Sequence, residues 1–126
     1  MELDAGVPKA IADTSEGECE RSGLLLSTAE AGRIESFVLS PAPLKPRRFE
    51  FDPQWCLTQL YRQREAGHTI AGYFHTHPKE ATLEPSRADR EGHPPHSLVL
   101  IVAGRAWKLY RTGLTGERWT LLSEGT

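Results

Sequence analysis

The stretch GYFHTHPKEATLEPSRAD, residues 72–89, contains two histidines one residue apart, directly after an apolar run. The run TIAGYFH, residues 69–75, is typical of a β-strand, and Pro78 ends it because proline has no backbone donor. On a strand, residues i and i+2 point to the same face, with Cα atoms roughly 6.5 Å apart. His75 and His77 can therefore converge on one metal ion where the strand ends.

Two further polar residues follow at helical spacing. Ser86 and Asp89 fit the S-x-x-D pattern that begins many helices, and residues at i and i+3 share one helical face. Zinc accepts imidazole nitrogen and carboxylate oxygen, and a catalytic zinc has three protein ligands and one water. The pattern predicts a zinc site made of His75, His77 and Asp89. The simpler alternative is a helix cap beside histidines that bind nothing.

The rest of the chain predicts a mixed α/β fold, with one mixed β-sheet flanked by two or three helices. The segment 97–104 is almost wholly apolar, which favours a central strand buried on both faces. Segments 105–111 and 117–123 alternate in polarity around a glycine-containing loop and are typical of a hairpin. Further strands are expected at 23–27, 33–40, 47–52 and 69–75, with a proline-rich loop at 41–46.

The clearest helix is expected at 53–66. Asp52 is a good N-cap, Pro53 suits the first helical position, and Gly67 suits the residue after the end. Spacings of three and four predict one apolar face, made of Leu57, Leu60, Tyr61 and the stem of Arg64. A shorter helix is expected within residues 7–16, with Pro8 in its first turn.

Composition limits the functional classes. The 126 residues, 38% hydrophobic and 25% charged, suit one soluble domain spanning residues 1–126. A net charge of −2 gives no electrostatic case for nucleic acid, and no apolar run approaches the roughly 18 residues that span a membrane. The N-terminus lacks signal-peptide features, and Cys19 and Cys56 are isolated small side chains that we expect to be buried. We therefore expect a cytoplasmic protein.

The motif HTHP…PSRAD resembles the signature of the JAMM (MPN-plus) zinc metalloproteases. That family has a distant glutamate shortly before a G-L-L-L-like strand, and here ECERSGLLLS places Glu20 three residues before Gly23. The resemblance extends from about Glu20 to Arg111. Members remove ubiquitin or ubiquitin-like proteins, or process the C-terminal tails of small sulfur-carrier proteins. The fold implied is the MPN/JAMM, cytidine-deaminase-like architecture.

The resemblance implies a role for each matching residue. His75, His77 and Asp89 would bind Zn²⁺, which lowers the pKa of a bound water to roughly 7. Glu20 would act as general base and return the proton to the leaving amine. Ser86 would donate a hydrogen bond to the oxyanion. Glu16 and Glu18 are nearby acidic alternatives, and Glu20 is chosen by its spacing from Gly23 alone.

Spacing also narrows the kind of enzyme expected. Eight residues separate His77 from Ser86, one more than is usual in the family. Only seven separate Asp89 from Ser97, which leaves no room for the insertion of linkage-selective deubiquitinases. We therefore expect a compact prokaryote-type member that acts on a ubiquitin-like or sulfur-carrier protein, with no nucleic-acid or membrane partner. The alternative is an inactive MPN-type scaffold. A nucleoside deaminase is excluded because no P-C-x-x-C is present.

The remaining histidines and tryptophans have simpler interpretations. His93 and His96 flank two prolines, so we expect them in a surface loop, with a supporting role at the metal site left open. His68 follows the helix and suits its C-terminal dipole or an exposed position. Trp107 and Trp119 are expected to be core residues or cross-strand partners.

Overall fold

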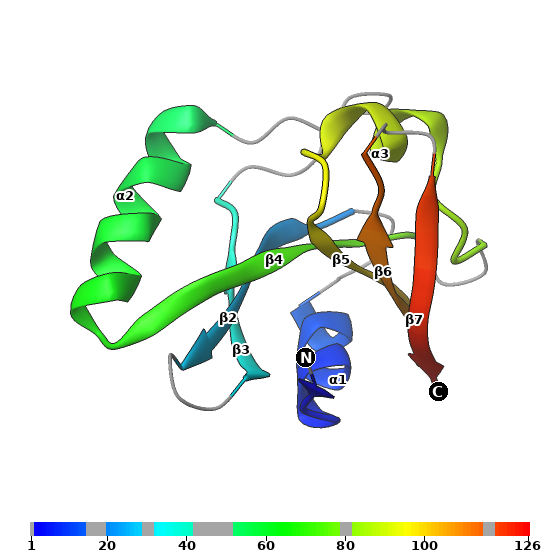
Figure 1. Ribbon diagram of the computed structural model, residues 1–126. Helices are drawn as coiled ribbons and strands as arrows, with labels where there is room; N and C mark the ends of the chain where they lie inside the picture. The colour runs from blue at the N-terminus through cyan, green and yellow to red at the C-terminus, as the bar shows by residue number, and fades with distance from the viewer. Residues whose placement is uncertain (1, 15–19, 29–31, 42–51, 79–81, 115–117) are drawn as a thin grey trace.

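The computed structural model describes residues 2–14, 20–28, 32–41, 52–78, 82–114 and 118–126. The elements in chain order are β1 (Glu2–Leu3), α1 (Gly6–Thr14), β2 (Ser22–Thr28), β3 (Arg33–Leu39), α2 (Pro53–Glu65), β4 (His68–Thr76), α3 (Arg87–Gly92), β5 (Leu98–Ala103), β6 (Ala106–Thr112) and β7 (Trp119–Gly125). Within the described residues, seven strands form one sheet in the order β1-β3-β2-β4-β5-β6-β7. Figure 1 shows α1 below this sheet and α2 and α3 above it.

The sheet is mixed, as the sequence predicts. β4 pairs in parallel with β5 and β1 with β3, whereas the other neighbouring strands are antiparallel. β5 is buried at every position, which confirms a central strand covered on both faces. The expected strands that can be compared begin and end within two residues of the observed ones, whereas β1 was not expected. Residues 47–51 of the strand expected at 47–52 lie outside the described residues.

Alternate residues of the central strands supply two separate cores, because successive side chains of a strand point to opposite faces. The core on the α1 side contains Val7, Ile11, Leu25, Ile34, Phe74, Leu98, Leu100, Val102 and Leu109. The opposite core contains Val99, Ile101 and Tyr110, with Leu83 and Trp119 packed against it. In β4, Phe74 belongs to the α1 core, so His75 points to the opposite face, toward α3.

The ends of α2 are those that the sequence predicts. The Asp52 side chain caps the helix by accepting a hydrogen bond from the Gln54 N–H at 3.0 Å. Pro53 is the first helical residue. Gly67 follows the helix with a positive φ of 82°, a conformation that glycine adopts at little cost.

The apolar face of α2 does not pack on the sheet, although helices usually bury such a face. Leu57, Leu60 and Tyr61 are 48%, 45% and 59% exposed, so they do not pack on the sheet. The helix instead buries Gln59, whose Oε1 accepts a hydrogen bond from Gln63 Nε2 at 3.3 Å. Only two residues separate α2 from β4, and we infer that this short turn, rather than hydrophobicity, decides which side of the helix meets the sheet.

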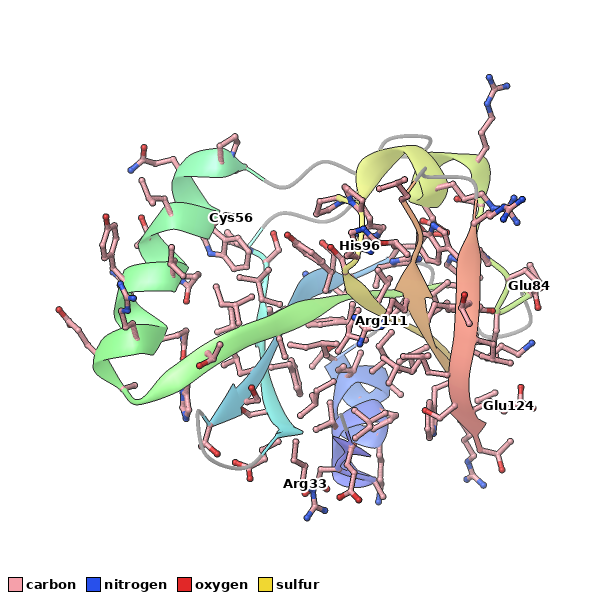
Figure 2. The ribbon with its side chains drawn as sticks, viewed as in Figure 1. Arg33, Cys56, Glu84, His96, Arg111 and Glu124 are labelled. Carbon is pink, nitrogen blue, oxygen red and sulfur yellow. The ribbon has the colours of Figure 1, made fainter. Side chains whose placement is uncertain are left out.

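Cys56 is a free thiol on α2, and it is only partly buried rather than fully buried as expected (Figure 2). Burial, together with the nearby charge of Asp52, raises the pKa of the Cys56 thiol above its ordinary value. Cys19 lies outside the described residues. Among the described helices, none is long and apolar enough to cross a membrane.

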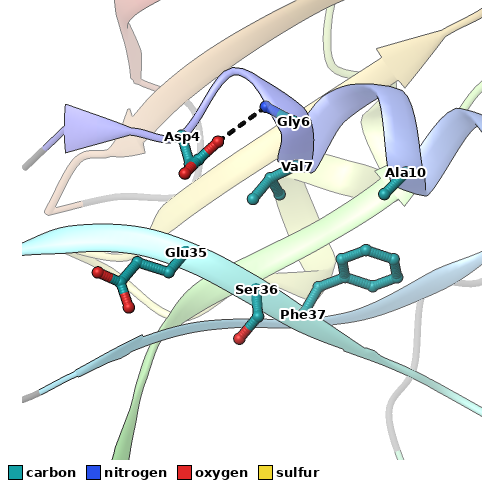
Figure 3. A pocket seen from close by; sticks show the side chains of 7 residues that line it. All are labelled: Asp4, Gly6, Val7, Ala10, Glu35, Ser36 and Phe37. Atoms are coloured by element: carbon teal, nitrogen blue, oxygen red, sulfur yellow. Dashed lines mark hydrogen bonds between the residues drawn. The ribbon is translucent and has the colours of Figure 1, made fainter.

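A hollow lies between α1 and β3, as Figure 3 shows. Within it, the Asp4 side chain accepts a hydrogen bond from the Gly6 N–H at 2.9 Å and so closes the turn that enters α1. Val7, which lines the hollow, belongs to the α1 core. The hollow therefore lies on the α1 side of the sheet, whereas His75 points to the other side.

Candidate metal centre

The three predicted metal ligands come together on the face of the sheet opposite α1. His75 Nε2 lies 3.1 Å from Asp89 Oδ1, and His77 Nε2 lies 3.1 Å from Asp89 Oδ2. The two Nε2 atoms are also 3.1 Å apart. In a tetrahedral zinc site with Zn–N distances of about 2.0–2.1 Å, ligand atoms lie about 3.3 Å from one another. The observed spacing therefore fits a small tetrahedral ion, although the same three residues could hold another divalent metal.

The sheet positions both histidines. His75 is fully buried and pairs with Ser22 of β2 on one side and Ile101 of β5 on the other. The chain stays attached to β5 beyond the last strand residue, because the His77 N–H donates to the Val102 carbonyl at 2.8 Å. Two ligands are thus fixed by backbone pairing with neighbouring strands, which is a rigid support for a metal site.

The second ring nitrogen of His77 has its own partner. His77 Nδ1 lies 2.7 Å from the Thr82 carbonyl oxygen, and a carbonyl can only accept, so Nδ1 carries the proton. In the neutral ring, Nε2 then has the free lone pair and faces Asp89 and His75. Such hydrogen bonds from the non-ligating nitrogen are usual for metal-bound histidine. The tautomer of neutral His77 therefore suits metal binding.

Asp89 is held by the start of α3. Its Oδ2 accepts a hydrogen bond from the Ser86 N–H at 2.7 Å, and its own N–H donates to Ser86 Oγ at 3.1 Å. This is a reciprocal capping box, so the expected S-x-x-D cap is present. The cap aims the carboxylate at the histidines, so the helix cap and the possible metal ligand are the same structure.

Asp89 reaches both histidines although the connection between His77 and Ser86 is one residue longer than is usual in the JAMM family. The loop before α3 is tied to the sheet by the Tyr110 hydroxyl, which donates to the Leu83 carbonyl at 3.0 Å. Lys108 Nζ lies 2.9 Å from Glu84 Oε1 and 3.8 Å from Glu124 Oε2, and Figure 2 shows both glutamates beside β7. Leu83 also packs against the core made of Val99, Ile101 and Tyr110.

In the metal-free site, Asp89 and His77 shift each other's pKa. Burial alone would raise the pKa of Asp89, but hydrogen bonds from His75 and His77 outweigh it and lower that pKa far below its ordinary value. Burial would lower the pKa of His77, but the hydrogen bond and charge of Asp89 raise it overall. Asp89 and His77 therefore each favour the charged form of the other.

Glu20 is half-buried and lies two residues before the start of β2, the strand that pairs with β4. Its negative charge contributes to raising the pKa of His77, so it lies within electrostatic reach of that residue. Ser86, the residue before α3, is exposed. The alternatives Glu16 and Glu18 fall outside the described residues.

His93 is the residue that the sequence reasoning placed wrongly. It is only 7% exposed rather than on the surface, and its ring stacks on that of His75, with centroids 5.8 Å apart and an interplanar angle of 15°. Burial, and then the charge of His75, lower the pKa of His93 to about 3, so this imidazole is neutral. Its position four residues after Asp89, one helical turn onward, was the available signal. His96 is exposed, as expected.

A sequence profile described as prokaryotic homologs of the JAB domain matches residues 9–121. Among curated proteins, none matches the chain.

Among the solved structures with a similar fold are three from prokaryotes. A protein from Desulfitobacterium hafniense is 19% identical with a TM-score of 0.75, and the match covers 97% of this chain and 89% of that one. For a JAB1/MPN domain protein from Archaeoglobus fulgidus, the identity is 19%, the TM-score 0.57 and the coverage 88% and 89%. A protein from Salinibacter ruber is 16% identical with a TM-score of 0.63, and the match covers 98% of this chain and 89% of that one. At these identities the likeness concerns the fold alone.

Proposed function

Because this chain belongs to the prokaryotic homologues of the JAB domain, we propose that it is a zinc metalloprotease of the JAMM type. It would cleave a peptide or isopeptide bond at the C-terminal tail of a ubiquitin-like or sulfur-carrier protein. The observation that carries this proposal is the convergence of His75, His77 and Asp89, with the carboxylate of Glu20 within electrostatic reach of His77. A purely structural cluster has no need of the additional carboxylate.

The residues around the three ligands suit amide hydrolysis. When bound, zinc supplies a strong Lewis acid that polarises a carbonyl and makes hydroxide available near neutral pH. Glu20 takes the proton of the attacking water and then gives it to the leaving amine. Ser86 is exposed, and its capping bond from the Asp89 N–H uses a lone pair of Oγ. The Ser86 O–H therefore stays able to donate to the oxyanion.

The proposed substrate class rests on the short connection that follows Asp89. Only seven residues, 90–96, connect Asp89 to the segment that enters β5. A protease without a large insertion has little surface with which to hold a second folded protein, so recognition falls mainly on the extended tail. Small ubiquitin-like or sulfur-carrier proteins with a flexible C-terminal tail fit this requirement. The same compactness suits tail processing as well as deconjugation.

Zinc content and cleavage together test the proposal. The purified protein is expected to bind one zinc per chain and to cut a sulfur-carrier or ubiquitin-like protein that carries a C-terminal extension, with the cut identified by mass spectrometry. His77→Ala is expected to lose both the metal and the cleavage. His68→Ala, a control at the other end of β4, keeps both.

The two readouts separate the alternatives. Wild-type protein without stoichiometric zinc would overturn the metalloprotease and favour the inactive scaffold. A zinc-loaded protein that cuts neither class of substrate would reject the proposed substrates while retaining the metal site.

A further inference from the structure

We propose that His93 is a positioning residue, whose ring holds the His75 imidazole in the orientation that metal binding requires. This inference rests on the metal-binding part of the proposed function and not on the substrate. His93 contacts a ligand and binds no metal itself, since its ring nitrogens are not among the converging ligand atoms.

The His93 ring covers one face of His75. The two rings are nearly parallel, with centroids 5.8 Å apart and 15° between planes, which is an offset stack within the usual range for ring pairs. The His77 ring also contacts His75, with centroids 4.9 Å apart and a tilt of 41°. His75 thus contacts the rings of both His77 and His93, and rotation about its side-chain bonds would break both contacts.

His93 is itself held by two aromatic side chains from different strands. Tyr73 of β4 lies with its ring centroid 5.4 Å from that of His93. Trp119 of β7 meets His93 edge-on at 5.4 Å and 65°, and Tyr110 of β6 packs against Trp119 at 5.7 Å. This support is rigid, because Tyr73, Trp119 and Tyr110 each belong to a strand of the same sheet.

His93 also connects the two elements that carry the ligands. It is the C-cap residue of α3, the helix whose capping box orients Asp89, and its backbone there is extended, with φ −111° and ψ 141°. Its ring reaches back to β4, which carries His75. One side chain therefore fixes both the ring of one ligand and the end of the helix that supplies another. Loss of that ring would leave the ligands present but less well ordered.

The role depends on ring packing, so an aromatic replacement should restore it. Supporting residues around metal ligands typically contribute about 10–100-fold in metal affinity. We expect His93→Ala to weaken zinc binding by about tenfold or more, and His93→Phe to remain within about threefold of the wild-type Kd. Zinc Kd is measured on folded protein by competition with a chromophoric chelator, with circular dichroism as the check of folding.

A matched control removes an aromatic ring from the other side of the sheet. Phe37 meets Phe74 edge-on at 5.3 Å in the α1 core, and Phe37→Ala should reduce stability while leaving the zinc Kd unchanged. Equal zinc Kd in wild type and His93→Ala would overturn the positioning role. The positioning role would also be overturned if His93→Phe bound zinc as weakly as His93→Ala.

A metal-free measurement separates this inference from the proposed function. In chelator-treated protein, a nuclear Overhauser contact between the His75 and His77 rings is expected in wild type and in His93→Phe, and its loss is expected in His93→Ala. An unchanged contact in His93→Ala would overturn the inference even if zinc binds and cleavage proceeds. A wild-type protein that keeps the contact but binds no zinc would overturn the proposed function instead, and with it any zinc-related role of His93.

Discussion

Ser22 lies opposite His75 in the antiparallel pair of β2 and β4. The pairing continues one residue beyond the strand end, where the Thr76 N–H donates to the Arg21 carbonyl at 2.8 Å, while the Arg21 N–H donates to the Thr76 side-chain Oγ1 at 2.8 Å. Glu20 is the next residue toward the N-terminus, and its negative charge contributes to raising the pKa of His77. Residues 53 and 55 positions apart in the sequence thus meet because two strands pair, and the proposed base lies just before this paired segment.

Replacing Glu20 by Gln separates metal binding from catalysis. Because Glu20 is not among the converging ligand atoms, Glu20→Gln should keep the zinc Kd within about threefold, while kcat falls by about 10²–10⁴-fold, the usual contribution of a general base. Glu84→Gln, which alters an exposed carboxylate paired with Lys108, is the control and should retain full activity. If Glu20→Gln cleaves as fast as wild type, Glu20 is not the base.

Ser86 has two roles that one substitution can separate. Glycine is nearly as good an N-cap as serine but has no hydroxyl, so Ser86→Gly should cost only a few tenths of a kcal/mol in stability. Loss of an oxyanion donor should still lower kcat by about 10²–10³-fold. Ser86→Thr keeps the hydroxyl and is expected to retain most activity. Chemical denaturation and initial cleavage rates give the two quantities, and full activity in Ser86→Gly would eliminate the oxyanion role.

The pH dependence of stability reports on buried His93. In the unfolded chain this histidine takes a proton below about pH 6.5, whereas in the folded protein its pKa is lowered to about 3 by burial and by the charge of His75. The unfolded state therefore binds more protons as the pH falls, and the folded state loses stability. From pH 6.5 to pH 5 this amounts to roughly 2 kcal/mol.

Urea denaturation of metal-free protein at several pH values measures that loss. His93→Phe should lose less stability than wild type on acidification, because the titrating group is gone. His96→Asn, which changes an exposed histidine with a positive φ of 57°, should behave as wild type. The expectation fails if the free energy of unfolding falls by the same amount in His93→Phe and in wild type between pH 6.5 and pH 5.

Gly23 tests the close packing of β2 against its neighbours. A methyl group at this position would meet the Val38 carbonyl oxygen and the ring of Phe74. Gly23→Ala should therefore destabilise the fold by about 1–3 kcal/mol, as overpacking in a well-packed core does. Gly6→Ala, at a position with ordinary space, should be neutral or slightly stabilising. Unfolding in urea gives the stability of both variants. If Gly23→Ala is as stable as Gly6→Ala, β2 and its neighbours accommodate the methyl group without destabilising the fold.

Sequence rules worked where the cause was local. Asp52 and Pro53 set the start of α2 within one turn, and Ser86 and Asp89 form their capping box within three residues. His75 and His77 share one face because a strand has a period of two. In each case the deciding contacts lie within the same element or the adjacent turn. The motif resemblance added Glu20, which local rules alone did not distinguish from Glu16 and Glu18.

The same rules failed where a distant partner decides. The spacing of Leu57, Leu60 and Tyr61 is typical of a buried helix face, yet these three side chains are about half exposed. His93 follows a short polar helix beside two prolines, which is typical of a surface loop. Its burial depends on His75 and on Trp119, which belong to two different strands.

By itself the sequence determined which residues form strands and helix starts and which side chains suit a metal, because period, capping and ligand chemistry act over a few residues. The tertiary structure alone decided that Asp89 reaches both histidines across the eleven residues 78–88, that Glu20 lies within electrostatic reach of His77, and that the ring of His93 stacks on His75. These contacts depend on strand register and on how α3 packs on the sheet, and both are fixed only when the sheet has formed.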